Sequence, residues 1–348
     1  MAFARKFVTA LLAATSLLCL TPAAPAADPA GPSLQAMKRD YARPTAVPFP
    51  ADNPYTVEKV RLGQQLFFDP RLSGDNTRSC ATCHNPALSW GDGLAKGIGT
   101  GGTLGRRSPT ILNLAWAELL MWDGRKDSLE AQALGPIESG MEMNLALKDV
   151  VPKLEKVDGY RTAFALAFPG EGLTLANVAK AIATYERTVV SGTAPFDRWV
   201  AGEEGAISDG AKRGFRLFNT KGNCAACHSG WNLTDHSFHD IGLPDKDIGR
   251  AEHLPLPSMR HAFKTPTLRD VARRAPYMHD GSLPDLWAVV EHYDKGGTAR
   301  PSLSPEMRPL RLTPQEKADL VAFMLTLTGE ADPVTLPALP VPAQPAGF

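Results

Sequence analysis

Apolar residues in this chain recur mostly at the spacing of one helix face. They predict helices over residues 57–67, 175–187, 286–293 and 314–327. In the third helix, the apolar series that starts at Leu286 reaches Tyr293 seven positions later and stops before Gly296-Gly297, so Tyr293 is expected to face inward. No segment sustains the alternation of a strand. We therefore expect a mostly α-helical fold with long loops.

The last of these helices has clear end signals. Thr313-Pro314-Gln315-Glu316 combines an N-cap, a first-turn proline and a capping-box acid, and Gly329 is expected to end the helix.

The first 27 residues predict a secretory signal peptide. Arg5 and Lys6 precede an apolar run over residues 7–20, and Ala24-Pro25-Ala26 offers a cleavage site. The run is too short to span a bilayer, and no later stretch reaches the required length, so we expect no membrane span and export to the periplasm. Cys19 follows Leu18 rather than a small residue, which argues against a lipid anchor.

Prolines mark both ends of the mature chain. Residues 28–56 contain Pro29, Pro32, Pro44, Pro48, Pro50 and Pro54. Such spacing predicts an extended arm without regular helix, lying across the folded body. Residues 331–348 form a proline-rich tail, which is expected to be mobile after Leu336.

Two copies of one five-residue motif hold four of the five cysteines. They are Cys80-Ala81-Thr82-Cys83-His84 and Cys224-Ala225-Ala226-Cys227-His228. Two thiols at this spacing can reach the vinyl groups of one porphyrin, and the histidine that follows can bind the iron. Each motif therefore predicts a covalent haem c site. Zinc knuckles or disulfides are the alternatives, but both leave the repeated histidine unexplained.

A second segment recurs ahead of each motif. Gly63-Gln64-Gln65-Leu66-Phe67 precedes the first motif, and Gly214-Phe215-Arg216-Leu217-Phe218 precedes the second. We infer two cytochrome c-like domains built on one plan, each with one covalent haem c. The polar segment Gly202-Glu203-Glu204-Gly205 is expected to separate them, which gives domains of 57–200 and 201–330.

Charge excludes one class of partner. Without Arg5 and Lys6 the chain has 35 basic and 37 acidic residues, a formal charge of −2. No basic run is interleaved with aromatic residues, so nucleic acid is not an expected partner. No pattern indicates an oligomeric state.

The sixth iron ligand separates electron carriers from catalysts, because an open position admits a small molecule. In the first domain only His84 is a histidine, so a second ligand there could come from Met121, Met141 or Met143; the alternative is an open iron that peroxide can reach. Candidates for the second haem are numerous: Met259, Met278, His236, His239, His253, His261, His279, His292, Tyr277 and Tyr293.

Several blocks carry a family resemblance: residues 66–73, Arg107-Ser108-Pro109-Thr110, Trp122-Asp123-Gly124-Arg125, Gln132, Gly135-Pro136-Ile137, Met141-Glu142-Met143, residues 265–269 and residues 275–281. Through them the chain resembles the bacterial dihaem cytochrome c peroxidases and MauG-type enzymes over nearly its whole mature length.

The resemblance implies roles for four residues at the first haem. Glu142 resembles the distal acid and base and Gln132 its polar neighbour. Pro136 resembles a wall of the pocket, and Trp122 resembles the bridge between the haems. A carboxylate beside peroxide can take the proton from one oxygen and return it to the other, so that water leaves. Without the resemblance, Glu142 would be interpreted as a solvated loop acid and Trp122 as a core residue.

Two further positions resemble the MauG-type branch. Typical peroxidases of the family place a histidine on the resting first haem, but the matching loop here, Gly97-Ile98-Gly99-Thr100-Gly101-Gly102, has none. We therefore expect activity without reductive activation. Tyr293 falls where those peroxidases carry a ligating methionine and MauG-type enzymes carry tyrosine. A phenolate ligand favours the higher oxidation states of iron.

Together these features imply an oxidoreductase that uses hydrogen peroxide at the first haem and oxidises a protein or other donor through Trp122 and the second haem. The iron ligands would be His84, His228 and Tyr293. Two rival functions stay open. One is a cytochrome c peroxidase fed by a small cytochrome or cupredoxin. The other is a non-catalytic dihaem carrier, against which the lack of a second histidine in the first domain argues.

Two departures limit the resemblance. MauG has a tryptophan just ahead of the second motif, where this chain has Lys221-Gly222-Asn223, so maturation of a tryptophan-derived quinone is not implied. The family also holds calcium between its domains through an asparagine and carbonyls near Ala275-Pro276. Arg107 stands at the asparagine position, which leaves one bound Ca²⁺ as an open alternative.

Overall fold

The computed structural model of the chain describes residues 33–330 and 333–341. The expected signal peptide lies outside these residues. From Leu34 onward the chain forms one unit by its contacts. None of the described helices is both long and apolar enough to cross a membrane.

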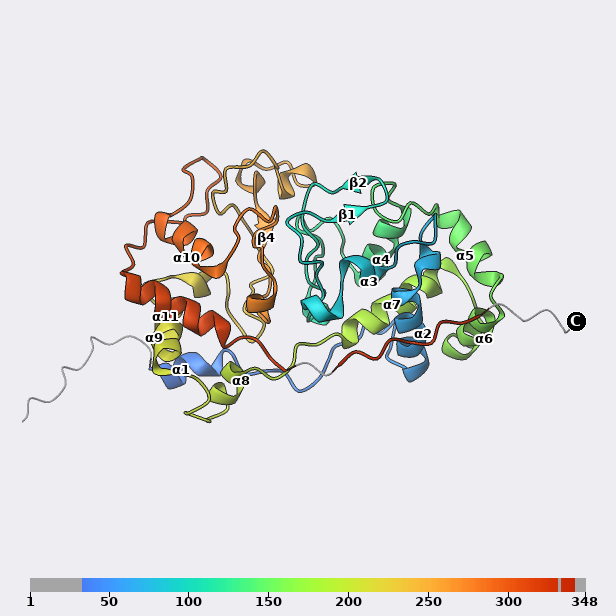
Figure 1. Cartoon of the computed structure of the whole chain (residues 1–348), viewed down its shortest axis with the longest axis horizontal. Coiled ribbons are helices and arrows are strands. Elements are labelled where there is room, and N and C mark those ends of the chain that lie inside the picture. The colour runs from blue at the N-terminus through green and yellow to red at the C-terminus, as the bar shows by residue number, and fades with distance from the viewer. Residues whose placement is uncertain (1–32, 331–332, 342–348) are drawn as a thin grey trace, which may run out of the picture. The chain divides into compact units, whose positions relative to one another are not determined.

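The described residues are mostly helical with long loops, as predicted (Figure 1). The α-helices are α1 (Leu34–Arg39), α2 (Val57–Phe68), α3 (Cys80–Cys83), α4 (Leu129–Glu138), α5 (Leu147–Glu155), α6 (Asp158–Ala167), α7 (Leu175–Thr188), α8 (Pro195–Val200), α9 (Asp209–Asn219), α10 (Leu286–Lys295) and α11 (Pro314–Leu325). Short 3-10 helices cover Pro70–Leu72, Pro86–Leu88, Leu114–Trp116, Cys224–Ala226, Arg250–Glu252, Pro257–Met259 and Val271–Arg273. Two antiparallel strand pairs complete the fold: β1 (Ile98–Gly99) with β2 (Gly102–Thr103), and β3 (Phe238–His239) with β4 (Phe263–Lys264).

The helices pack into two main cores. In the first, α2 lies along α7, and α4, α5 and α6 close the sides (Figure 1). In the second, α9 lies along α11, and α1, α8 and α10 add to the same core. Helix α8 precedes the expected division at residue 200, yet its Phe196 and Trp199 are buried in the second core.

The repeated glycine segment lies at the same crossing in both cores. A Cβ added at Gly63 of α2 would stand 1.9 Å from the Ala181 carbonyl oxygen of α7. A Cβ added at Gly214 of α9 would stand 1.9 Å from the Asp319 carbonyl oxygen of α11. Each glycine therefore lets two helix backbones touch, which supports one plan for both domains.

Most predicted helix ends are confirmed. The Thr313 hydroxyl accepts a hydrogen bond from the Glu316 N–H at 3.2 Å, and the Glu316 carboxylate accepts one from the Thr313 N–H at 2.7 Å. Gly296 ends α10 in the left-handed conformation, at φ 81°. Helix α11 ends at Leu325, four residues before the predicted stop at Gly329.

The proline-rich arm is not wholly extended, which corrects the expectation of no helix. Helix α1 forms in the proline-free run between Pro32 and Pro44, because proline restricts only its own position and the residue before it. The arm still contacts the body: the Tyr41 hydroxyl donates to Asn219 Oδ1 at 2.7 Å, and Arg43 Nη2 donates to the Ser191 carbonyl at 2.6 Å.

The described part of the tail is docked rather than free, contrary to the expectation of a mobile tail. Gln64 donates to the Thr335 carbonyl at 3.1 Å, Gln65 to that of Ala338 at 3.0 Å, and Arg71 to that of Pro340 at 2.9 Å. An extended proline-rich strand makes no internal hydrogen bonds, so its carbonyls are available to these donors.

Candidate active site

Both C-x-x-C-H motifs open into one cavity of about 780 Å³. Helix α3 presents the first motif, and the 3-10 helix Cys224–Ala226 presents the second. All four cysteines are free thiols, so the disulfide alternative is not formed. The zinc alternative also fails, since the two motifs do not converge within the described residues; Cys227 alone of the cysteines joins a metal-ligating cluster.

The two motif histidines are held in the orientation that iron ligation requires. His84 Nδ1 lies 3.2 Å from the Trp90 carbonyl oxygen, and His228 Nδ1 lies 2.9 Å from that of Leu233. An Nδ1–H bonded to a carbonyl leaves Nε2 to bind a metal. Burial lowers the pKa of both imidazoles, which keeps them neutral and able to ligate.

The cavity also carries donors without partners. Arg107 Nε, Arg274 Nε and His236 Nδ1 are buried, have no hydrogen-bond partner and belong to residues that line the cavity. Buried donors are normally satisfied. Haem propionates are anionic acceptors of the required kind, so the residues present fit two haem c groups.

Helix α4 supplies two of the expected first-haem residues. Gln132 and Pro136 stand four positions apart, and both line the cavity. Gln132 Nε2 donates to Met121 Sδ at 3.7 Å. The other two methionines of the first domain, Met141 and Met143, line the cavity as well, so methionine ligation of the first iron stays an alternative.

Glu142 lies on the loop after α4 and also lines the cavity. The hairpin of β1 and β2 grips its backbone: Thr100 N–H donates to the Glu142 carbonyl at 2.8 Å, and Gly101 N–H to that of Met141 at 3.2 Å. A side chain at Gly99 would collide with the Met141 carbonyl, at 1.8 Å from its Cβ. The loop over residues 97–102, in which the typical peroxidases carry a histidine and this chain carries none, therefore holds the backbone of Glu142 in place.

Trp122 lies where the two domains meet. Its indole N–H donates to the Arg107 carbonyl at 3.0 Å, and its own carbonyl accepts the N–H of Lys264, in β4, at 2.8 Å. Its ring stands 6.4 Å from that of His279 in an edge-to-face arrangement. The residue therefore contacts both domains and lines the cavity that both haem motifs share.

Tyr293, on α10, lines the same cavity as the second motif, and the helix periodicity had predicted that it faces inward. It lines the cavity, and burial, followed by the nearby Cys224 and Cys227, raises the pKa of its phenol. A bound cation reverses such a shift by stabilising the phenolate.

The other candidates for second-haem ligation divide into two groups. Met259, His261 and His292 do not line the cavity, and the Tyr277 hydroxyl donates to the Val271 carbonyl at 3.0 Å. The candidates that do line it beside Tyr293 are His236, His239, His253, Tyr277, Met278 and His279, although the Tyr277 hydroxyl is already engaged with the Val271 carbonyl.

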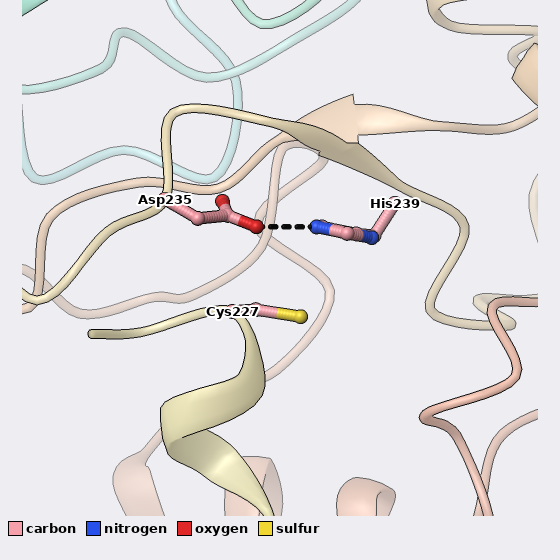
Figure 2. A group of neighbouring side chains, drawn as sticks. All are labelled: Cys227, Asp235 and His239. Atoms are coloured by element: carbon pink, nitrogen blue, oxygen red, sulfur yellow. Dashed lines mark hydrogen bonds and ion pairs between the residues drawn. The ribbon is translucent and has the colours of Figure 1, made fainter.

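A cluster of Cys227, Asp235 and His239 has the composition of a metal site (Figure 2). His239 Nε2 lies 2.7 Å from Asp235 Oδ2, and that carboxylate is the main cause that raises the pKa of His239 to about 10. Cys227 belongs to the second haem motif, so its sulfur is committed to the porphyrin. The cluster is an ion pair beside the haem rather than a separate metal site.

Comparison with known proteins shows which families the chain matches. Residues 57–205 match the family described as di-haem cytochrome c peroxidase, and residues 211–328 match cytochrome c. The methylamine utilization protein MauG of Methylorubrum extorquens is 53% identical over 327 residues, which covers 92% of this chain and 93% of that protein. The cytochrome c551 peroxidase of Pseudomonas aeruginosa is 34% identical over 299 residues, with 82% and 83% covered.

The chain belongs to the dihaem cytochrome c peroxidase and MauG family. A solved MauG-like protein associated with microbial copper homeostasis has the same fold, with a TM-score of 0.77 at 32% identity over 83% of this chain and 95% of that one. Membership confirms the prediction of two cytochrome c domains, of two covalent haem c groups and of a peroxide-dependent oxidoreductase.

The residues at the calcium position that the resemblance implies do not suit a cation. Arg107, which the resemblance sets at the position of the asparagine ligand, donates from Nη1 to the Arg274 carbonyl at 2.8 Å. A cationic donor thus contacts the segment that would offer oxygen ligands.

Sequence reasoning missed Glu186, a buried carboxyl group on the cavity. Its side chain is 4% exposed, and its Oε2 is buried without a hydrogen-bond partner. Burial raises its pKa to about 8, since the guanidinium of Arg187 pairs with Glu130 at 2.7 Å instead. The available signal was its position on α7, four residues after Ile182 on the apolar face.

Proposed function

We propose that this protein reacts with hydrogen peroxide at its first haem site and passes the oxidising equivalents through Trp122 to the second, where a protein or other donor is oxidised. The observation that carries the proposal is the arrangement around Glu142. Its loop is gripped by a glycine hairpin that offers no histidine to fill the sixth iron position. That arrangement favours an open first site with an acid beside it.

Glu142 would handle the protons of the reaction. When bound, the first haem supplies the iron at which peroxide is split. Glu142 would take a proton from one peroxide oxygen and return it to the other, which would leave as water. Gln132, tied to Met121, offers an amide to orient the peroxide, and Pro136 limits the space.

Tyr293 would adapt the second site to store oxidising equivalents. Its phenol, which lines the cavity, would hold the iron of a second haem as a phenolate, and such an anionic ligand would lower the haem potential. The Trp122 indole donates to the Arg107 carbonyl and its backbone carbonyl accepts the Lys264 N–H of the other domain, which supports a role for this oxidisable indole between the two sites. These two residues support the MauG-type function over electron delivery to a peroxidase.

The partners and the location follow the same proposal. The substrates are hydrogen peroxide and a redox protein or protein substrate in the periplasm, to which the expected signal peptide would direct the chain. Among its relatives are proteins named for methylamine utilization.

The test uses the fully ferric holoprotein and one equivalent of peroxide without reductant. The wild-type protein should react rapidly, and Glu142→Gln should slow the reaction by about 100-fold or more because the proton carrier is lost. Glu138→Gln, an exposed acid at the end of α4, is the matched control and should react like the wild type. Equal rates for Glu142→Gln and the wild type would contradict the proposal.

A second candidate function is peroxide reduction with electrons from a small cytochrome or cupredoxin, since cytochrome c peroxidases stand among the relatives. Steady turnover with such a reduced donor, at rates far above those with any protein substrate, would favour it. The MauG-type proposal expects slow turnover with these donors.

A further inference from the structure

Arg107 joins the two domains through both its backbone and its side chain. It is 8% exposed. Its N–H donates to the His279 carbonyl at 2.8 Å, its Nη1 donates to the Arg274 carbonyl at 2.8 Å, and its own carbonyl accepts the Trp122 indole N–H at 3.0 Å. One residue thus fixes both ends of the segment 274–279 and the indole at the junction.

The charge at this junction is already positive. Burial, followed by the neighbouring charge of Arg107, lowers the pKa of Arg274 to about 10. Arg274 Nη2 donates to the Thr267 carbonyl at 2.6 Å, so both guanidinium groups use backbone carbonyls as acceptors. A further cation would meet two like charges in a site with little water.

Among the described residues, no group of three or more acidic, histidine or cysteine side chains gathers around Arg107 and the segment 274–279. Calcium takes six to eight oxygens, several of them from carboxylates. Within the described part of the chain, neither of the two clusters of side chains with metal-ligating composition includes Arg107 or a residue of the segment 274–279. They are Cys227 with Asp235 and His239, and Asp123 with Glu252 and His253. The Arg274 carbonyl is occupied by a guanidinium N–H.

We propose that the Arg107 guanidinium is the resident cation of this junction, in place of the calcium ion of the family, and that Arg107 is a positioning residue for Trp122. A guanidinium suits this role because it stays charged and its planar donors can reach carbonyl oxygens in fixed directions. The protein therefore needs no metal at the junction. This inference does not rest on the peroxide chemistry.

The first test measures calcium in the wild-type holoprotein after dialysis, together with its thermal unfolding. We expect less than about 0.1 calcium per chain, and the same Tm with EDTA as with millimolar calcium. One calcium per chain, whose removal by EDTA lowers the Tm, would overturn the proposal. This measurement requires no variant to fold.

The second test is Arg107→Asn, which removes the guanidinium and supplies an amide oxygen. Its Tm should fall by roughly 5 °C in EDTA and recover in millimolar calcium, because a metal can then take the vacated position. The chain has six tryptophans, so the contribution of Trp122 to second-derivative absorption spectra is isolated as the difference from a Trp122→Phe background. That contribution should shift and recover in parallel. A loss that calcium does not restore would count against Arg107 as the substitute cation.

Arg106→Asn is the matched control. Arg106 also links the domains, with Nε 2.7 Å from Asp247 Oδ2 and Nη1 2.5 Å from Asp123 Oδ2. Within the described residues its side chain donates to these two carboxylates and to no carbonyl of the segment 274–279. Its loss should lower the Tm without any rescue by calcium. Rescue of both variants alike would show that calcium acts elsewhere and would contradict the proposal.

Discussion

At the scale of the residue, Glu186 links burial to the pH dependence of stability. Its pKa is about 8 in the folded protein, against an ordinary value of 4.5. Between these two values the folded state binds the proton more tightly than the unfolded state. The contribution of Glu186 to the free energy of unfolding is therefore fully present below pH 4.5 and is lost as the pH rises towards 8.

The corresponding prediction concerns Glu186→Gln, which keeps the shape and removes the titration. The free energy of unfolding of the wild type should fall by up to about 1.4 kcal/mol per pH unit in this window, and the slope should flatten in the variant. Guanidinium titrations from pH 5 to 9 measure it. Glu138→Gln, at an exposed position, should keep the wild-type slope. Parallel curves for Glu186→Gln and the wild type would show that Glu186 does not titrate there.

Sequence reasoning reached the residues whose chemistry is local. The motif histidines could be predicted because thiols and imidazole must follow one another in a fixed order. The burial of Glu186 and the partners of Arg107 could not be predicted from the sequence. Both depend on packing between segments far apart in the chain, such as the bond from Arg107 to the Arg274 carbonyl. The roles of Glu142 and Trp122 came from resemblance alone, and the structure adds their surroundings.

At the scale of the element, each domain depends on one glycine at a helix crossing. Gly63→Ala and Gly214→Ala would each place a methyl group against a carbonyl oxygen of the partner helix. We expect each variant to lose about 3 kcal/mol of stability, because two packed backbones must separate. Thermal unfolding measures the loss. Gly205→Ala, with open space around its added Cβ, is the control. Unchanged stability of both crossing variants would show that the crossing can relax freely.

Helices with local end signals were the predictable elements. Thr313 and Glu316 bond reciprocally as the sequence indicated, and Gly296 ends α10. Helix α1 was not predicted, because the prolines on both sides disfavour a helix although the run between them contains none. The membership of α8 in the second core depends on Phe196 packing edge-on against Phe323 of α11, a contact that no local pattern reveals.

At the scale of the whole molecule, residues of two cytochrome domains line one cavity, and the side chains differ between its two sides. The first side presents Glu142 and Gln132, and the second presents Tyr293. The junction between them is tied by Arg107, Arg106 and the backbone of Trp122. Such an arrangement allows one site to receive an oxidant and the other to hold the equivalents, and its two iron centres should therefore differ in coordination.

The most direct measurement is the electron paramagnetic resonance spectrum of the ferric holoprotein, taken for the wild type and for Tyr293→Phe. The account predicts one high-spin signal from the open first haem and one low-spin signal from the second. In Tyr293→Phe only the low-spin signal should change, because the phenolate ligand is lost while Glu142 and its loop are untouched. Two low-spin haems that do not respond to peroxide, or a spectrum unaffected by loss of the Tyr293 hydroxyl, would contradict it.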